Sequence, residues 1–379
     1  MSSGPVDGLR RLRVSRSDRS DLAWSEGLQV NIPQSALAAT GLDRCIDSDG
    51  NLTIPAALPP VDAGAAETLR LRRAFTPEPP ASARMPVSYR RVPGPLRRAI
   101  GDAIGRWQRR RESEWAAFPG WPLDLSSDLL TDLSRPGTAA LSRTPVLLTH
   151  DIDSPDGLRN LVQRFLPIEE TVGARSTNYI VPCAWELDQG LLAEVHRRGH
   201  ELGVHGFDHA NRTPFVSTAE RRQRLLAAVP LAERFGMRGY RAPSLLRTRE
   251  LLADLAEFYT YDSSIPTSGG PFPVPNNGCA SARPFRVGGL LEIPVSMPRD
   301  GSLRFLGFRA NAICDTWKAC ATRIARSGGV VVLLTHCEDH FSGNAEMLET
   351  YRTFLTWIAA DARFVWSRSE DLAASLQHD

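Results

Sequence analysis

Short apolar runs alternate with amphipathic stretches over the C-terminal two thirds of the chain. The apolar runs are PVLLTHD, STNYIV, HELGVH, MRGYRAP, LLEIPV, GVVVLLTH and RFVWSR, and stretches such as TAERRQRLLAAVPLAERFG separate them. This alternation predicts βα units around a parallel sheet or barrel. In such folds the groups that carry chemistry collect at the carboxyl ends of the strands. The polar residues that directly follow each apolar run are therefore the candidates for a functional site.

The first 140 residues follow a different pattern. Segments rich in Pro, Ala and Arg, such as PAALPPVDAGAA and TPEPPASARMP, interrupt the apolar positions and predict loops. The stretch LRRAIGDAIGRWQRRRESEWAAF has apolar positions at near-helical spacing and predicts one amphipathic helix, which would serve either a dimer contact or closure of a substrate cleft. We therefore expect an N-terminal accessory region, 1–140, partly helical and packed on a (β/α) domain formed by 141–379.

Composition and charge narrow the class of protein only slightly. Lys and Arg total 45 against 43 Asp and Glu, so the net charge is +2, which gives no reason to expect nucleic acid or a membrane as partner. The six cysteines are scattered without a CxxC pair, which predicts free thiols in a reducing compartment. No apolar stretch of signal-peptide length follows the basic residues at the N-terminus, and no later segment is suited to span a bilayer. These features predict a cytoplasmic protein.

Two of the strand ends carry residues suited to bind a metal ion. Asp151 and Asp153 lie at the end of the apolar run PVLLTHD, although a solvated turn or a helix cap explains two such acids about as well. His205 and His209 follow another run, and their spacing of four would place both imidazoles on one side of a helical turn. A lone pair of this spacing is weak evidence. With Asp153 it forms a His-His-carboxylate set that leaves coordination positions open for water and substrate.

Three further strand ends supply an arginine, a carboxylate and a histidine. Arg241, in RAPS, is able to hold an acidic side chain by bidentate hydrogen bonds, although a single arginine is more often a surface residue. Asp262 lies in YDSS and His336 in LLTH. Four of the eight histidines in the chain fall within the strand-end motifs, which chance scatter does not readily explain.

The motifs THDID, HGFDH, RAPS, YDSS and LLTH, in this order, resemble those of the polysaccharide deacetylase family with NodB homology, carbohydrate esterase family four. The resemblance implies a distorted, incomplete (β/α) barrel and one divalent cation, usually zinc, with cobalt or nickel as alternatives. RAPS lacks the aromatic residue or glycine that often follows the arginine motif of the family. YDSS departs from the family's DxxDW form. Both departures concern the substrate class more than the chemistry.

By position in these motifs, the resemblance implies that Asp153, His205 and His209 bind the metal. Many family members have two adjacent aspartates in the first motif, whereas Ile152 separates Asp151 from Asp153 here. A branch of the family with an HDVD motif has the same separation and uses the second aspartate as ligand. We follow that branch, with Asp151 as the alternative ligand.

The resemblance also implies the residues of catalysis. Asp151 matches the catalytic base, Arg241 the arginine that orients this base, and His336 the general acid, while Asp262 would tune His336. Chemistry supports the role of His336, because an amine leaves an amide readily only when it is protonated.

The expected activity is metal-dependent hydrolysis of an N-acetyl or other acyl-amide group on an amino-sugar-type substrate, either a soluble sugar or oligosaccharide or a glycosylated biosynthetic intermediate. One alternative is a metal-dependent amidohydrolase of a non-sugar amide, as in allantoinase-like relatives. The other is a non-catalytic carbohydrate-binding module of the same fold. The sequence leaves open whether the chain forms a homo-oligomer.

Overall fold

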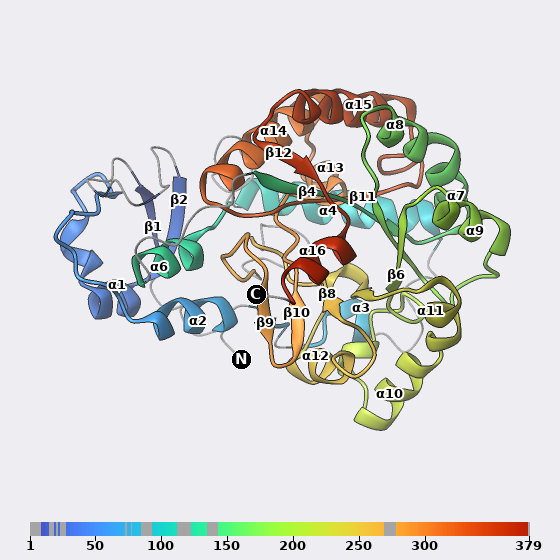
Figure 1. Cartoon of the computed structure of the whole chain (residues 1–379), viewed down its shortest axis with the longest axis horizontal. Coiled ribbons are helices and arrows are strands. Elements are labelled where there is room, and N and C mark those ends of the chain that lie inside the picture. The colour runs from blue at the N-terminus through green and yellow to red at the C-terminus, as the bar shows by residue number, and fades with distance from the viewer. Residues whose placement is uncertain are drawn as a thin grey trace.

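The computed structural model describes residues 9–14, 19, 22, 28–72, 74–76, 78–84, 93–111, 123–134, 143–268 and 278–377. In this part of the chain, one sheet of nine strands contains every strand from Thr144 onward (Figure 1). These strands are β4 (Thr144–Ile152), β5 (Thr177–Ile180), β6 (Glu201–His205), β7 (Gly239–Arg241), β8 (Tyr261–Asp262), β9 (Phe285–Val287), β10 (Leu290–Glu292), β11 (Val331–His336) and β12 (Phe364–Trp366).

The sheet is parallel and open. Its strand order is β11-β4-β5-β6-β7-β8-β10-β9, with β12 paired to the start of β4, and only β9 runs antiparallel to its neighbour. The edge strands β11 and β9 are not paired with each other among the described residues, so the curled sheet does not close into a barrel. This arrangement is the distorted, incomplete (β/α) barrel that the motifs implied.

Helices connect the strands and cover the outside of the sheet (Figure 1). They are α7 (Pro155–Asn160), α8 (Leu166–Thr171), α9 (Gln189–Arg197), α10 (Thr218–Leu226), α11 (Val229–Phe235), α12 (Arg249–Leu255), α13 (Asp300–Phe305), α14 (Ala310–Arg326), α15 (Ala345–Ala359) and α16 (Ser369–Ser375). Short 3₁₀ turns lie at Thr213–Phe215 and Pro243–Leu245, and a π turn at Leu161–Phe165 joins α7 to α8. The alternation of strands and helices predicted from the sequence is confirmed.

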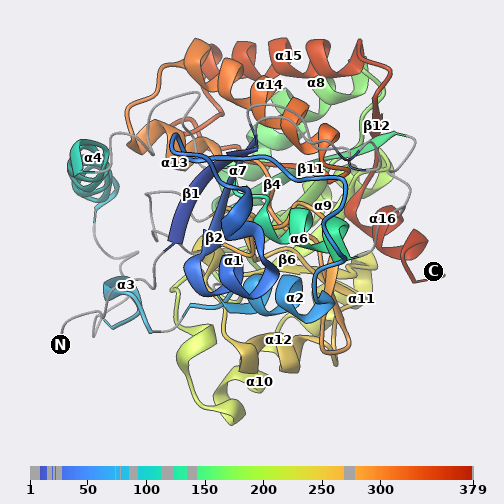
Figure 2. The same ribbon diagram turned by 90° about the vertical axis from the view of Figure 1, so that its left-hand side faces the viewer.

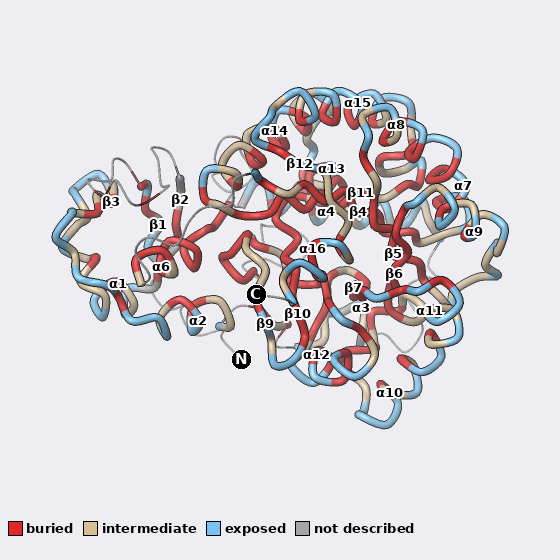
Figure 3. Tube along the Cα trace, in the orientation of Figure 1, coloured by how far each residue is buried: buried red, intermediate tan, exposed pale blue. Residues whose placement is uncertain are grey.

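Local sequence explains where these elements begin and end. The strand β4 is buried along almost its whole length, as expected for an apolar run covered on both faces (Figure 3). Ser154 caps α7 by accepting a hydrogen bond from the Gly157 N–H, and Asp188 and Asn344 cap α9 and α15 in the same way. Gly236 ends α11 with a left-handed backbone, φ +63°.

The N-terminal region forms a separate small sheet to one side of the barrel (Figures 1 and 2). Its strands are β1 (Leu9–Val14), β2 (Leu28–Pro33) and β3 (Asn51–Leu52) in the order β2-β1-β3, and its helices are α1 (Gln34–Thr40), α2 (Ala63–Arg72), α3 (Ala81–Arg84), α4 (Gly94–Arg111) and α6 (Ser126–Ser134), with a 3₁₀ turn at Leu42–Cys45. The sequence pattern predicted loops and one amphipathic helix in this region, but neither the further helices nor this sheet. Its strands pair mainly with each other, a non-local arrangement that apolar periodicity does not reveal.

The helix α6 joins this region to the barrel. The carboxylate of Asp128 accepts hydrogen bonds from the Ser281 hydroxyl at 2.5 Å and from the Ala282 N–H at 2.8 Å. The Ser127 N–H donates to the carbonyl of Ala280 at 2.9 Å. The N-terminal region therefore contacts the barrel through α6. The strand β4 begins at Thr144, and the proposed boundary at residue 140 lies outside the described residues.

Two further sequence expectations concern the whole chain. All six cysteines are unpaired, as their scattered spacing predicted. Over the described residues, no helix combines the length and apolar character needed to cross a lipid bilayer.

Candidate metal centre and active site

Most of the predicted site residues lie at one edge of the main sheet. Asp151 lies near the end of β4, and β6, β7 and β11 end at His205, Arg241 and His336. The parallel register pairs His336 with Asp151 and, further along the sheet, His205 with Arg241. Because the carboxyl ends of parallel strands meet at the same edge, segments far apart in the sequence bring these side chains together.

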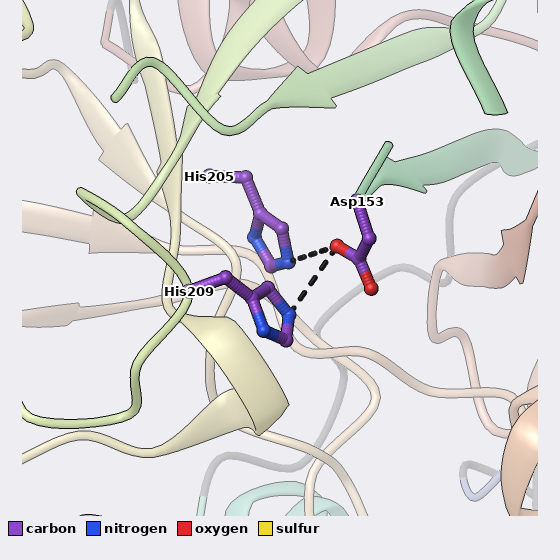
Figure 4. A group of neighbouring side chains, drawn as sticks. All are labelled: Asp153, His205 and His209. Carbon is purple, nitrogen blue, oxygen red and sulfur yellow. Dashed lines mark ion pairs between the residues drawn. The ribbon is translucent and has the colours of Figure 1, made fainter. Parts of the chain in front are cut away.

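Asp153, His205 and His209 converge on one point (Figure 4). Asp153 Oδ1 lies 3.4 Å from Nε2 of His205 and 3.3 Å from Nε2 of His209. A tetrahedral ion with ligand bonds of about 2.0–2.1 Å holds neighbouring ligand atoms roughly 3.3–3.4 Å apart, so the spacing fits a zinc-like ion. Asp153 Oδ1 and His205 Nε2 are buried and have no hydrogen-bond partner among the described residues. Buried polar atoms normally have a hydrogen-bond partner, so two neighbouring buried atoms that lack one are candidates to bind a cation.

A tight loop, rather than the helical turn expected from the spacing of the two histidines, presents His209. His205 is the last residue of β6, and the residues after it form bends, with φ +68° at Gly206 and φ +58° at His209. A Cβ atom at Gly206 would lie 2.4 Å from Cδ of Pro243, so only glycine allows this loop to pack on the RAPS segment. The positive φ of His209 is backbone strain at a candidate ligand.

Neighbouring groups orient the candidate ligands. Nδ1 of His205 lies 3.0 Å from the carbonyl oxygen of Arg241, and a hydrogen bond donated there leaves Nε2 to face the cluster. The carboxylate of Glu338 accepts hydrogen bonds from the Asp153 N–H at 3.1 Å and the Ser154 hydroxyl at 2.8 Å. Glu338 therefore holds the turn that presents Asp153.

The pKa values of the two carboxyl groups, Asp153 and Glu338, are shifted in opposite directions. Burial favours a raised pKa for Asp153, but the imidazoles of His209 and His205 outweigh it and hold the pKa of this carboxyl well below its usual range. Burial, followed by the charge of Asp153, raises the pKa of Glu338 to about 7. Asp153 is thus ionised, as a metal ligand must be.

Arg241 contacts Asp151 in the interior of the site. Its guanidinium donates to Asp151 Oδ1 at 3.2 Å, to the Thr149 hydroxyl at 2.8 Å and to the carbonyl and hydroxyl oxygens of Ser263, each at 2.8 Å. The same group lies over the ring of Tyr179, 4.2 Å from its centroid. Arg241 is fully buried and fixed on several sides, so it determines the position of the Asp151 carboxylate. The other oxygen of Asp151 lies 3.6 Å from Nε2 of His205, beside the cluster.

His336 is held by Asp300 and not by Asp262 as expected. Asp300 Oδ1 lies 2.8 Å from Nδ1 of His336, and Oδ2 accepts from the His336 N–H at 2.8 Å and from the Ser342 hydroxyl at 2.7 Å. Burial opposes the charged ring, but Asp300, followed by Asp153 and Asp151, raises the pKa of His336 to about 10. An imidazole with this pKa is protonated at neutral pH.

Asp262 faces the other side of the sheet. Its carboxylate accepts from the Ser264 hydroxyl at 2.7 Å, and in the parallel register it pairs with Tyr240 and Glu292. Successive side chains in a strand point to opposite faces, so Asp262 shares a face with Tyr240, whereas Arg241 points to the other. The expectation that Asp262 tunes His336 is wrong for this reason.

Asp300 is a candidate site residue that the sequence did not predict. It lies 36 residues before His336, at the start of α13, and follows the apolar run LLEIPV by several residues. The available signal is its place in the loop that follows β10, several residues beyond the end of this strand.

Comparisons with known proteins are informative about the fold. No family model and no curated protein matches the chain. Among solved structures, a chain from Mycobacterium smegmatis, assigned by its name to the polysaccharide deacetylases, matches with a TM-score of 0.52 and 20% identity over 64% of this chain and 93% of that one. A chain from Pseudomonas aeruginosa PAO1 with a similar name matches with a TM-score of 0.50 and 15% identity over 63% and 92%.

Proposed function

We propose that this chain, which has the fold of the polysaccharide deacetylases, is a metal-dependent hydrolase of that family that cleaves an N-acetyl or other acyl-amide group. One observation carries the proposal: three ligand atoms at coordination spacing lie at the sheet edge that also carries the Asp151–Arg241 pair and the His336–Asp300 pair. A base and an acid beside one cation are the groups that amide hydrolysis requires.

The cation would be held by Asp153, His205 and His209, whose buried ligand atoms fit a small divalent ion. Zinc is our first choice because two imidazoles and one carboxylate suit it, and cobalt or nickel would be accepted by the same donors. When bound, such a cation polarises a carbonyl and makes water acidic enough to ionise near neutral pH. Asp151 is not our choice as ligand, because Arg241 already engages its carboxylate.

Asp151 would act as the general base. Its carboxylate would accept a proton from the water that attacks the amide carbon, while the hydrogen bond from Arg241 keeps the acceptor oxygen in place. Arg241 would thus be a positioning residue, because it acts through Asp151.

His336 would act as the general acid. Its Nδ1 is engaged by Asp300, which leaves the proton on Nε2 for the departing nitrogen. When the carbon–nitrogen bond breaks, this proton converts a poor leaving group into a neutral amine. Asp300 stabilises the protonated ring before the reaction and would orient it.

We propose an amino-sugar-type substrate, either a soluble sugar or oligosaccharide or a glycosylated biosynthetic intermediate. The names of the two similar structures, which refer to polysaccharide deacetylases, support this class. A cytoplasmic location remains part of the proposal and rests on the sequence expectation.

The test is acetate release from a panel of N-acetylated sugars by metal-stripped protein, with and without added zinc or cobalt. His205→Ala removes a ligand, and Asp151→Asn keeps the ligands but removes the base. We expect acetate release that requires metal, is lost in both variants, and is accompanied by metal binding that only His205→Ala loses.

Other outcomes select among the alternatives. Metal binding without acetate from any sugar, but with hydrolysis of a cyclic non-sugar amide, would establish the non-sugar amidohydrolase. Sugar binding without hydrolysis of any amide would indicate the carbohydrate-binding module. Wild-type protein that binds no divalent ion would contradict the proposed mechanism.

A further inference from the structure

The helix α4 exposes an apolar stripe to solvent. Leu96, Ile100, Ile104 and Trp107 are 52%, 49%, 43% and 57% exposed, and they account for four of the six large apolar side chains exposed in the described part of the chain. Their spacing of four, four and three residues places them along one side of the helix. Single exposed apolar residues are ordinary, but a continuous stripe of four indicates a contact surface.

A different face of α4 packs on the barrel. Gly101 and Gly105 lie against Phe305 of α13, so closely that a Cβ at Gly105 would be 2.0 Å from the carbonyl oxygen of Phe305. The Arg109 guanidinium donates to the carbonyl of Leu306 at 2.7 Å. The helix is therefore held through its glycines, and the apolar stripe cannot turn inward without the loss of this contact. Figure 2 shows α4 at the periphery of the molecule.

The residues of α4 are strongly basic. The segment GPLRRAIGDAIGRWQRRR contains six arginines and one acidic residue, Asp102. Arg98, Arg106 and Arg110 are exposed along the helix. The net charge of +2 for the whole chain conceals this local concentration, which is why the overall charge predicted no membrane partner.

We propose that α4 docks on the surface of an anionic phospholipid bilayer. A helix with an apolar stripe, an aromatic residue on that stripe and arginines beside it has the composition of helices that lie in the plane of the headgroups. Each arginine near an anionic surface adds about 1 kcal/mol, roughly a fivefold gain in binding. A second copy of the chain is a poorer occupant, because a two-fold contact would place one arginine-rich helix against another.

The position of α4 connects this surface with the candidate active site. The helix packs on α13, whose first residue, Asp300, holds His336. Burial, together with the charges of Arg98 and then His336 and Arg304, lowers the pKa of His340 to about 4, so the charge of α4 reaches the loop after His336. Docking would therefore bring the candidate site close to the lipid surface. The docking proposal does not depend on the proposed hydrolase activity.

The test is cosedimentation of the full chain with vesicles of phosphatidylcholine alone and with 40 mol% phosphatidylglycerol. The double variant Ile100→Asp/Ile104→Asp disrupts the stripe, and Arg106→Gln/Arg110→Gln removes two charges. Leu226→Asp is the control for an exposed apolar residue elsewhere, because Leu226 is 55% exposed on α10, which lies apart from α4 in both views (Figures 1 and 2). Circular dichroism and thermal unfolding establish that each variant is folded.

We expect binding to the phosphatidylglycerol vesicles that salt weakens, with little binding to phosphatidylcholine alone. Ile100→Asp/Ile104→Asp should abolish vesicle binding, and Leu226→Asp should leave it unchanged. Arg106→Gln/Arg110→Gln should weaken the affinity about 25-fold, because each of the two arginines contributes roughly fivefold. Wild-type protein that does not bind these vesicles, or stripe variants that bind as well as wild type, would overturn the proposal. A dimer in solution that Ile100→Asp/Ile104→Asp converts to a monomer would assign the stripe to a second copy instead.

Discussion

Replacement of Asp300 by asparagine should lower the pKa of His336. The carboxylate contacts both Nδ1 and the main-chain N–H of His336, each at 2.8 Å, and asparagine keeps the shape of the side chain while removing its charge. The rise of the His336 pKa from 6.5 to about 10 corresponds to about 5 kcal/mol in favour of the charged ring, and Asp300 is the largest contributor to this rise. An adjacent opposite charge changes a pKa by about 1–3 units, so the pKa should fall to between about 7 and 9.

The measurement is a pH titration of the histidine rings by NMR in metal-free protein, with His336→Gln to assign the resonance. The matched control is Asp262→Asn, because the Asp262 carboxylate contacts Ser264 and not His336. The reasoning is refuted if Asp300→Asn leaves the midpoint of His336 near 10, or if Asp262→Asn lowers it equally. In the metal-loaded enzyme, the alkaline limb of the rate profile should move to lower pH in Asp300→Asn if His336 is the acid.

The same contact predicts how stability depends on pH. The folded-state pKa of His336, about 10, is above the ordinary value of 6.5, so the folded chain binds this proton more tightly than the unfolded chain. The stabilisation is fully present below about pH 6.5 and is lost as the pH rises towards 10. Metal-free wild type should therefore lose more stability than Asp300→Asn between pH 7 and pH 10, as measured by urea denaturation.

Three further predictions concern the rest of the site. Loss of a residue that only hydrogen-bonds to a metal ligand lowers metal affinity roughly 10–100-fold. His205→Ala should lower the cobalt affinity measured by calorimetry by more than this, and a smaller loss would argue that His205 is not a ligand. Arg241→Met leaves Asp151 buried without its partner and should lower the free energy of unfolding, measured by urea denaturation, by about 3–5 kcal/mol. A loss below about 1 kcal/mol would contradict this prediction. Gly206→Ala should destabilise by about 1–3 kcal/mol more than Gly236→Ala, because both positions have positive φ but only Gly206 meets a neighbour; equal losses would contradict this.

Much of the fold was predictable because its signals are local. The apolar runs and amphipathic stretches after Thr144 predicted the alternating strands and helices, and the ordered motifs implied the open barrel. The small N-terminal sheet was not predictable, because its strands are short and separated by polar segments, and their pairing is decided by contacts distant in sequence. The face of α4 that contacts the barrel was equally unpredictable, because the apolar spacing that predicted this helix marks its exposed side, whereas glycines form the contact with the barrel.

For the candidate site, residue types and their order along the chain predicted Asp151, Asp153, His205, His209, Arg241 and His336. Parallel strands bring the residues that follow them to one edge, so a sequence rule was sufficient for these. The partner of His336 was not predictable in the same way. Asp262 lies in a motif but its strand position turns it to the opposite face, while Asp300 reaches His336 only because α13 packs beside β11. The sequence alone determined which chemical groups are available at the strand ends, whereas the tertiary structure decided which of them touch, because strand register and helix packing set the direction of each side chain.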